Sequence, residues 1–151
     1  SIHDAEVCLS SVANMKQIHI EKNFDNSVKV NGRCFGEEIL VQDMITNIVK
    51  NALEASPRGR SVTITCIYSD VDLHILVHNH GAIPENIRNN FFDKYVTFGK
   101  SFGTGLGTYS AKLIAEAHGG QISFSTSEED GTTVFISLPI PEKNEAGLVS
   151  E

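Results

Sequence analysis

The stretch that decides the fold runs from Phe98 to Gly120 and reads FGKSFGTGLGTYSAKLIAEAHGG. Three glycines, Gly103, Gly105 and Gly107, alternate with other residues, and a helical pattern follows at once. Backbone N–H groups at a helix start have no partner within the helix, and the helix dipole favours an anion there. Glycine also lets the backbone approach a ligand closely. The pattern is therefore typical of a phosphate-binding turn, or of a flexible linker whose glycines merely precede a helix.

Two well-known phosphate-binding loops are excluded by the spacing of these glycines. The dinucleotide fingerprint is G-x-G-x-x-G directly after a strand, whereas this G-x-G-x-G follows a long loop. The Walker loop ends in Gly-Lys-Ser/Thr, but Gly107 is followed by Thr108 and Tyr109. Motifs elsewhere in the chain are needed to distinguish a ligand site from a linker.

A long helix is predicted from 36 to 56, and it contains NIVKNALEAS at 47–56. Asn47 and Asn51 are four residues apart and therefore lie on one face, and Glu54 continues this polar stripe. Side-chain carbonyl oxygens are ligands that Mg²⁺ accepts beside phosphates and water. The alternative is an ordinary solvated face. The apolar face of this helix is expected at Val41, Ile45, Ile48 and Ala52.

A third candidate segment is VHNHGAIP at 77–84, where a strand ends. Gly81 frees the backbone, and Ile83 with Pro84 opens a short helix. Asn79 offers both a donor and an acceptor, which suffices to recognise an adenine edge. This segment is suited to closing over a flat ligand.

Strands are predicted at 15–24, 27–32, 61–68, 71–80, 121–126 and 132–139, and helices at 36–56, at 84–91 and from 106 to Gly119. Hairpins dominate this order, so we expect an α+β fold. It is a two-layer sandwich with a mixed, mostly antiparallel sheet and helices on one face. The predicted inward residues are Val62, Ile64, Cys66 and Tyr68 on one strand, Val71, Leu73, Ile75 and Val77 on the next, and Leu106, Ser110, Leu113 and Ala117 on the last helix.

Composition excludes several classes of function. The 151 residues carry a net charge of -7 and no basic stripe, which argues against a nucleic-acid binder. No apolar run reaches the ~20 residues that a membrane helix needs. The three cysteines have no C-x-x-C spacing, so we expect reduced packing residues rather than disulfides or zinc ligands. His78 and His80 could bind a metal, but ordinary polar positions are the favoured interpretation.

Taken together, these segments resemble the GHKL superfamily of ATP-binding domains, and most of all the catalytic, ATP-binding domain of a bacterial sensor histidine kinase. NIVKNALEAS resembles its N box, VHNHGAIP its first glycine box, FFDKYVTFGK (91–100) its phenylalanine box and ATP lid, and GTGLGTYSAKLIAEAHGG (103–120) its second glycine box. GTTVFISLP (131–139) resembles the closing strand. The resemblance covers roughly residues 30 to 140, and the motifs agree in order and spacing as a set.

The resemblance implies catalytic and metal-binding roles for two residues. Asn51 would coordinate Mg²⁺ between the ATP phosphates, and Asn47 would help to hold the metal or its water shell. The hydrolytic branches of the superfamily carry a Glu at the position of Asn47. An amide cannot replace that general base, so transfer to a partner is favoured over efficient hydrolysis.

The resemblance also implies a set of cofactor-binding residues. At the adenine, an Asp is usual; Asn79 is the preferred counterpart and His78 the alternative, because the segment looks one residue short. Gly81 and Ile83 would line this pocket, and Thr132 would support the base through a water. Phe91 and Phe92 would anchor the lid, and either Lys94 or Lys100 would contact the γ-phosphate. The remaining lid and phosphate residues would be Tyr95, Thr97, Gly103, Thr104, Gly105, Leu106 and Gly107.

The function implied by the resemblance is that of an ATP-binding catalytic domain. It would bind ATP and Mg²⁺ and donate the γ-phosphate to a His on a separate dimerisation domain of the same protein, with a response regulator downstream. His3 is not the expected acceptor. We expect one domain at 1–141, as a fragment of a longer kinase, and a polar tail at 142–151. The domain would be cytoplasmic, without membrane or nucleic-acid contacts. The alternatives are a serine kinase of the anti-sigma-factor type and a degenerate, non-catalytic scaffold.

Overall fold

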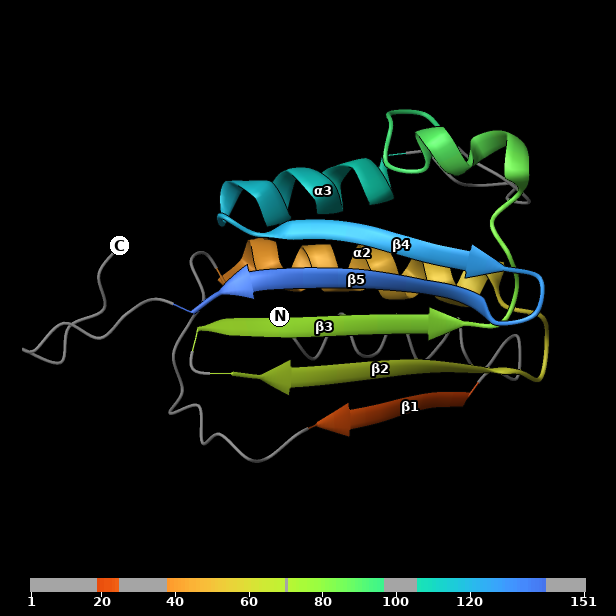
Figure 1. Cartoon of the computed structure of the whole chain (residues 1–151), viewed down its shortest axis with the longest axis horizontal. Helices are drawn as coiled ribbons and strands as arrows, with labels where there is room; N and C mark the ends of the chain where they lie inside the picture. Colours follow the sequence, from red (N-terminus) through yellow and green to blue (C-terminus); the bar gives the residue numbers. More distant parts are fainter. Residues whose placement is uncertain (1–18, 25–37, 70, 97–105, 141–151) are drawn as a thin grey trace, which may run out of the picture.

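The computed structural model describes residues 19–24, 38–69, 71–96 and 106–140. A five-stranded sheet with the strand order β1-β2-β3-β5-β4 forms one layer. β1 and β2 are parallel, and the other neighbouring pairs are antiparallel. Figure 1 shows α2 and α3 on one side of this sheet. The predicted α+β sandwich is confirmed. In chain order the elements are β1 (His19–Phe24), α2 (Glu38–Ala55), β2 (Ser61–Tyr68), β3 (Asp72–Asn79), the 3-10 helix η1 (Glu85–Asn90), α3 (Gly107–Ala117), β4 (Gln121–Ser127) and β5 (Gly131–Pro139).

The element bounds agree closely with the prediction, apart from the first strands. β2 occupies the predicted residues, and α3 ends at the predicted glycines, with Gly119 at a φ of 75°. β1 is described over His19–Phe24, and the predicted strand residues 15–18 lie outside the described residues. The predicted strand at 27–32 lies outside the described residues.

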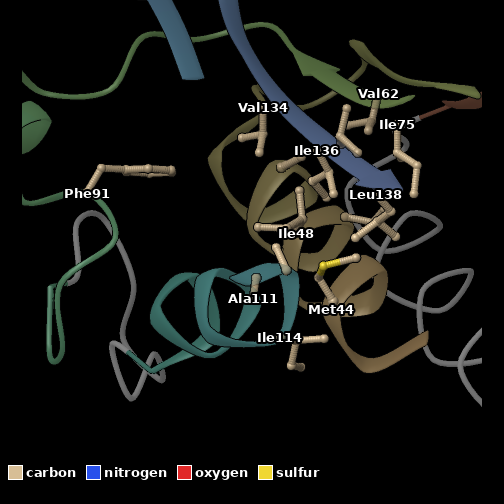
Figure 2. Packing of buried hydrophobic residues seen from close by; sticks show 14 of the residues in the cluster. Met44, Ile48, Val62, Ile75, Phe91, Ala111, Ile114, Val134, Ile136 and Leu138 are labelled. Carbon is tan, nitrogen blue, oxygen red and sulfur yellow. The ribbon is translucent and has the colours of Figure 1, made fainter. Parts of the chain in front are cut away.

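The core lies between the sheet and the two helices. Figure 2 shows Met44 and Ile48 of α2 beside Ala111 of α3, with Ile75 and Ile136 from the sheet above them. Because α2 is covered by the sheet on one side and by α3 on another, its buried surface is wider than one apolar stripe. The fully buried apolar residues of α2 are Met44, Ile48, Val49, Ala52 and Leu53. The predicted face is confirmed but incomplete: Val41 and Ile45 pack half-buried against this core, and Met44, Val49 and Leu53 are buried in addition.

The predicted inner face of α3 is wrong. Leu106 and Leu113 are 39% and 47% exposed, and Ala117 is exposed as well. The helix instead buries Thr108, Ala111, Ile114 and Ala115. The small alanines let the α3 backbone approach α2 closely, so packing selected the face with less apolar bulk.

The two central strands alternate as predicted. In β3 the buried residues are Leu73, Ile75, Val77 and Asn79. In β2, Val62 is buried and Ile64, Cys66 and Tyr68 pack half-buried against the core. Val71 was wrongly included in this inner face. It precedes β3, is 66% exposed, and its carbonyl accepts a hydrogen bond from the N–H of Ile140.

Candidate functional site

One end of the candidate site, which is predicted to hold the base and is called the base end, lies where β3 ends and β5 begins. Asn79 is the last residue of β3, is only 4% exposed, and continues the helix-facing row of Ile75 and Val77. Its Nδ2 donates to the carbonyl of His80 at 3.1 Å. His78 belongs to the opposite row of the strand, and its Nε2 lies 2.7 Å from the carbonyl oxygen of Asp130. Of the two candidates for the adenine position, Asn79 is the one inside the sandwich.

Gly81 brings the loop after β3 against the end of α2. Its φ is 115°, which L side chains rarely adopt. A Cβ at this position would lie 3.1 Å from the carbonyl oxygen of Ala55. Two residues later Ile83 is 2% exposed, and its N–H donates to Thr126 Oγ1 at 2.9 Å. The loop therefore has a fixed course between α2 and β4.

Thr132 ties this loop to β5. It is paired with Asn79 in the register of β3 and β5, and it is 4% exposed. Its hydroxyl donates to the carbonyl of Gly81 at 2.8 Å and lies 2.9 Å from the hydroxyl of Thr126. The structure thus brings four of the sequence-predicted site residues together at this end, namely Asn79, Gly81, Ile83 and Thr132.

Two residues of this end escaped the sequence analysis. Thr126 joins Ile83 and Thr132, although its only signal in sequence is a polar residue late in a strand. Gly131 has a φ of 77°, and a Cβ there would collide with the carbonyl oxygen of Asn79. The glycine of the SEEDG turn could have been flagged as a turn residue, but its contact with Asn79 depends on strand pairing.

The other end of the candidate site, which is predicted to hold the phosphates and is called the phosphate end, lies where α2 meets the start of α3. A Cβ added to Gly107 would lie 3.9 Å from the Cβ of Asn47, so the second glycine box packs directly on the N box. Asn51 follows one turn later on the same face of α2, and both asparagines are half-buried. Leu106 is the N-cap of α3 and offers no side-chain cap. The first N–H groups of α3 therefore open beside Asn47.

Phe91 and Phe92 pack the chain that precedes the predicted lid against the core. Phe91 is 3% exposed and its ring centroid lies 5.0 Å from that of Phe92 and 4.9 Å from that of Phe124 in β4. Its carbonyl accepts a 2.9 Å hydrogen bond from the hydroxyl of Thr108 in the first turn of α3. The start of α3 is thus fixed from two sides, by α2 and by Phe91.

The described part of the lid ends soon after this anchor. Tyr95 is 74% exposed and has a φ of 63°, which is uncommon outside glycine. Lys94 Nζ lies 5.0 Å from the centre of the Tyr109 ring, as a cation over an aromatic face. The predicted site residues Thr97, Lys100, Gly103, Thr104 and Gly105 lie outside the described residues.

A pair of histidines lies at the end of β3, the central strand of the sheet. The rings of His78 and His80 meet edge to face, with 5.3 Å between their centroids, and Arg60 contacts His80 Nδ1 at 3.2 Å. Desolvation, followed by the charges of Arg60 and His78, lowers the pKa of His80. Within the described ranges no three His, Cys, Asp or Glu side chains gather into a metal-binding group.

Burial also affects the one cysteine in the described part of the chain. Cys66 is half-buried in β2, and desolvation raises the pKa of its thiol. A thiol that is harder to ionise is a poor nucleophile, which suits a packing residue.

No helix in the described ranges has the length and apolar character needed to cross a membrane.

The chain is similar to known proteins in sequence and in fold. Residues 36–142 match the family model described as histidine kinase-, DNA gyrase B-, and HSP90-like ATPase. Sporulation kinase A of Bacillus subtilis (strain 168) is 31% identical over 140 residues, which cover 91% of this chain and 22% of that protein. Sensor histidine kinase WalK of the same organism is 37% identical over 116 residues, which cover 69% of this chain and 19% of that protein. The chain therefore spans about a fifth of the length of these relatives.

Solved structures show the same fold. The catalytic domain of histidine kinase ThkA in a nucleotide-free form superposes with a TM-score of 0.72 at 26% identity, over 91% of this chain and 89% of that one. Full-length ShkA in complex with AMPPNP gives a TM-score of 0.74 at 18% identity, over 91% of this chain and 29% of that one. With its matched family model, its sensor-kinase relatives and this fold, the chain belongs to the histidine kinase-, DNA gyrase B- and HSP90-like ATPase family.

Proposed function

We propose that this chain is the catalytic domain of a sensor histidine kinase. It binds ATP with Mg²⁺ and supplies the γ-phosphoryl group to a histidine on a dimerisation domain of the same protein. A response regulator then receives the group, and the domain works in the cytoplasm. The relatives named as kinases support this proposal, as does the packing of the N box on the second glycine box.

The observation that carries the proposal is the meeting of Asn47 and Gly107. An amide-bearing helix face and the open N–H groups of a helix start lie side by side there. Such N–H groups and the positive end of the helix dipole suit phosphate oxygens. The overall charge of -7 makes a local device of this kind necessary for an anionic ligand. We therefore assign the triphosphate to this end.

The donor set here fits Mg²⁺ bound together with phosphates. Asn51 would offer its amide oxygen to the metal, and Asn47 would hold the metal or its water shell. Mg²⁺ commonly takes only one or two protein oxygens and completes its shell with phosphate oxygens and water. When bound, the metal would neutralise the charge that develops on the phosphates.

The base would lie at the other end, against Asn79. The burial of Asn79 among β3 core residues supports this assignment over His78, because adenine recognition needs a group inside the sandwich. The amide carbonyl accepts from the adenine amine, and Thr132 holds a water beside it. Gly81 and Ile83 would pass along the edge of the base.

Transfer is favoured over hydrolysis by the chemistry of Asn47. In the transfer, a nitrogen lone pair of the acceptor imidazole forms a bond to the γ-phosphorus, and the bond from that phosphorus to the β,γ-bridging oxygen breaks. ADP leaves with the bond's electrons. A neutral amide at Asn47 cannot take a proton from water, so a competing attack by water has no general base there.

The first test is calorimetric titration of the 151-residue chain with a non-hydrolysable ATP analogue, with and without Mg²⁺, and with a GTP analogue as control. We expect Mg²⁺-dependent binding that favours the adenine nucleotide. No binding at millimolar concentrations would overturn the proposal and favour a degenerate scaffold used for protein contacts.

The Asn51→Ala variant tests the metal assignment. We expect the Mg²⁺-dependent gain in affinity to fall by about a hundredfold, because a ligand of the metal is removed. Asn89→Ala, an exposed amide on η1, is the matched control and should bind as the wild type does. An unchanged Mg²⁺ effect in Asn51→Ala would contradict the assignment.

A transfer assay separates the kinase from the serine-kinase alternative. The catalytic domain is mixed with radiolabelled ATP and the dimerisation domain from its own full-length protein. Label that is lost in acid but stable in base identifies phosphohistidine and supports the proposal. Acid-stable label on serine would instead support a kinase of the anti-sigma-factor type.

A further inference from the structure

Glu54 is the member of the α2 polar stripe to which the proposed function gives no role. It lies three residues after Asn51 and seven after Asn47, so the three side chains share one face of the helix. Glu54 is half-buried, whereas Lys50, one turn earlier on the same face, is exposed. The surface around Glu54 is therefore partly covered, although this side chain carries a charged group.

Contacts near both ends of this stripe set the course of α2 through the site. At the phosphate end, the Cβ of Asn47 lies 3.9 Å from a Cβ added to Gly107. Towards the base end, the carbonyl oxygen of Ala55 lies 3.1 Å from a Cβ added to Gly81. Asn47 and Ala55 are separated by about 12 Å along the helix axis, at 1.5 Å per residue. A nucleotide that reaches from one end to the other therefore passes along this stretch of α2.

Between these two contacts, few side chains of α2 are available to a ligand. Four of the seven intervening residues belong to the core, namely Ile48, Val49, Ala52 and Leu53. The others are Lys50, which is exposed, and the half-buried Asn51 and Glu54. Because Asn51 is assigned to the metal, Glu54 is the half-buried polar group that borders the stretch between the metal and the base.

The charge of Glu54 decides which part of a nucleotide it can contact. A carboxylate repels phosphate oxygens, and it can only accept hydrogen bonds. The ribose lies between the base and the phosphates, is uncharged and offers two neighbouring hydroxyl donors. The two carboxylate oxygens can accept from both hydroxyls, and hydrogen bonds to an ionised acceptor are stronger than neutral ones. Dinucleotide-binding folds use an acidic residue for the ribose 2′-hydroxyl in the same way.

We propose that Glu54 binds the ribose hydroxyls and makes the site selective for ribonucleotides over 2′-deoxyribonucleotides. The inference rests on the proposed function, because it needs the base and the triphosphate at the two ends of the site. A ligand without the 2′-hydroxyl leaves one carboxylate oxygen without its hydrogen bond, which lowers the affinity. This selection acts on the sugar, so it can be measured separately from the roles of Asn79 and Asn51.

The experiment measures the affinities of the 151-residue chain for non-hydrolysable analogues of ATP and 2′-deoxy-ATP, by calorimetry with and without Mg²⁺. We expect the wild type to prefer the ribonucleotide by about tenfold, the value of one good hydrogen bond. Glu54→Ala should lose most of this preference. Glu54→Gln should lower it to about threefold, because a neutral amide accepts more weakly than a carboxylate.

Asp43→Ala is the matched control for the loss of a negative charge. Asp43 is an exposed residue of α2 that lies four residues before Asn47, on the same face but outside the stretch between the two ends. This variant should keep the wild-type preference for the ribonucleotide. Thermal unfolding without ligand is recorded for every variant.

The outcomes separate this inference from the proposed function. A wild type that binds both analogues equally and with Mg²⁺ dependence overturns the inference and leaves the proposed function standing. A folded Glu54→Ala variant that keeps the preference overturns it as well, and a simultaneous loss of the Mg²⁺ dependence would assign Glu54 to the metal instead. If Glu54→Ala does not fold, an unchanged preference in Glu54→Gln overturns the inference. A wild type that binds neither analogue overturns the proposed function, and the inference with it.

Discussion

At the proposed base end of the site, Asn79 and Thr132 lie on paired strands, and hydrogen bonds tie them to the backbone of the loop that contains Gly81. At the proposed phosphate end, by contrast, Asn47 and Gly107 meet because two helices pack together. The geometry of the first end depends on strand register and on backbone shape at two glycines. The geometry of the second depends on the volume of the core under α3. The two ends should therefore fail under different substitutions.

Phe91→Ala should have the largest effect, because it removes a buried ring that packs against Phe92 and Phe124 and so holds in place the backbone carbonyl that accepts the Thr108 hydroxyl. We expect unfolding free energy to fall by about 4 kcal/mol, the usual cost of deleting a buried phenylalanine side chain. Urea denaturation measures the loss. Phe135→Ala, on the outer face of β5 and 38% exposed, is the control and should cost less than about 1 kcal/mol. Equal losses for the two variants would contradict this account of the phosphate end.

Gly131→Ala should distort the backbone at the base end, because Gly131 has a positive φ and lies against Asn79. Gly131 and Gly59 have nearly the same φ, 77° and 79°, but only at Gly131 would a Cβ meet the carbonyl oxygen of Asn79. We expect a loss of about 3 kcal/mol for Gly131→Ala and about 1 kcal/mol for Gly59→Ala, since only the first adds a collision to the strained φ. Chemical denaturation of both variants checks the difference, and similar losses would show that the close approach is not important.

Asn79→Leu compares the two ends of the site by their effects on nucleotide affinity. It should weaken the ATP analogue by about tenfold while leaving the Mg²⁺ dependence unchanged, because the metal is held at the other end. Asn51→Ala should do the reverse, with the Mg²⁺ effect lost and the preference for adenine over guanine retained. Calorimetry with both nucleotides gives the two ratios. A variant at one end that changed both ratios equally would show that the ends are not independent.

The smallest effect concerns His80, behind the base end. Desolvation first, then the charges of Arg60 and His78, lower the pKa of His80 below the ordinary histidine value of about 6.5. As the pH falls, His80 therefore becomes protonated in the unfolded chain before it does so in the folded chain. The stability that neutral His80 contributes to the folded state is present above pH 6.5 and is lost as the pH falls below that value. Proton NMR titration should find a depressed midpoint for His80.

Removing one of the charges tests the cause of that shift. Arg60→Gln should raise the His80 midpoint towards the ordinary value, because one repelling charge is gone. Arg58→Gln, two residues away and exposed, removes an equal charge and should have less effect. If both variants moved the midpoint equally, a general field rather than the contact with Arg60 would be the cause.

Much of the fold was predictable because it depends on local pattern. Alternation in 61–68 identified β2 residue by residue, and the glycines after Ala117 marked the end of α3. The prediction failed where packing between elements decides which residues are buried. Leu106 and Leu113 look like core residues in sequence, but the structure buries Ala111 and Ile114 instead, since small residues permit close contact between the helices.

Some residues of the candidate site were likewise predictable from local sequence, and others were not. The four-residue spacing of Asn47 and Asn51 is enough to place both on one helix face. The residues around Gly81 likewise predict the turn there. Thr126 could not be found from sequence, and Gly131 was recognisable only as a turn residue, because their importance lies in contacts with Ile83, Thr132 and Asn79 across the sheet. No local propensity records a contact between residues so far apart in the chain.

The sequence by itself determined the elements, their order and the motifs at their ends, because period and turn chemistry act over a few residues. The tertiary structure alone decided which face of α3 is buried, that Gly131 lies against Asn79, and that Gly107 lies against Asn47. These depend on strand register and helix packing, where residues distant in sequence compete for the same space.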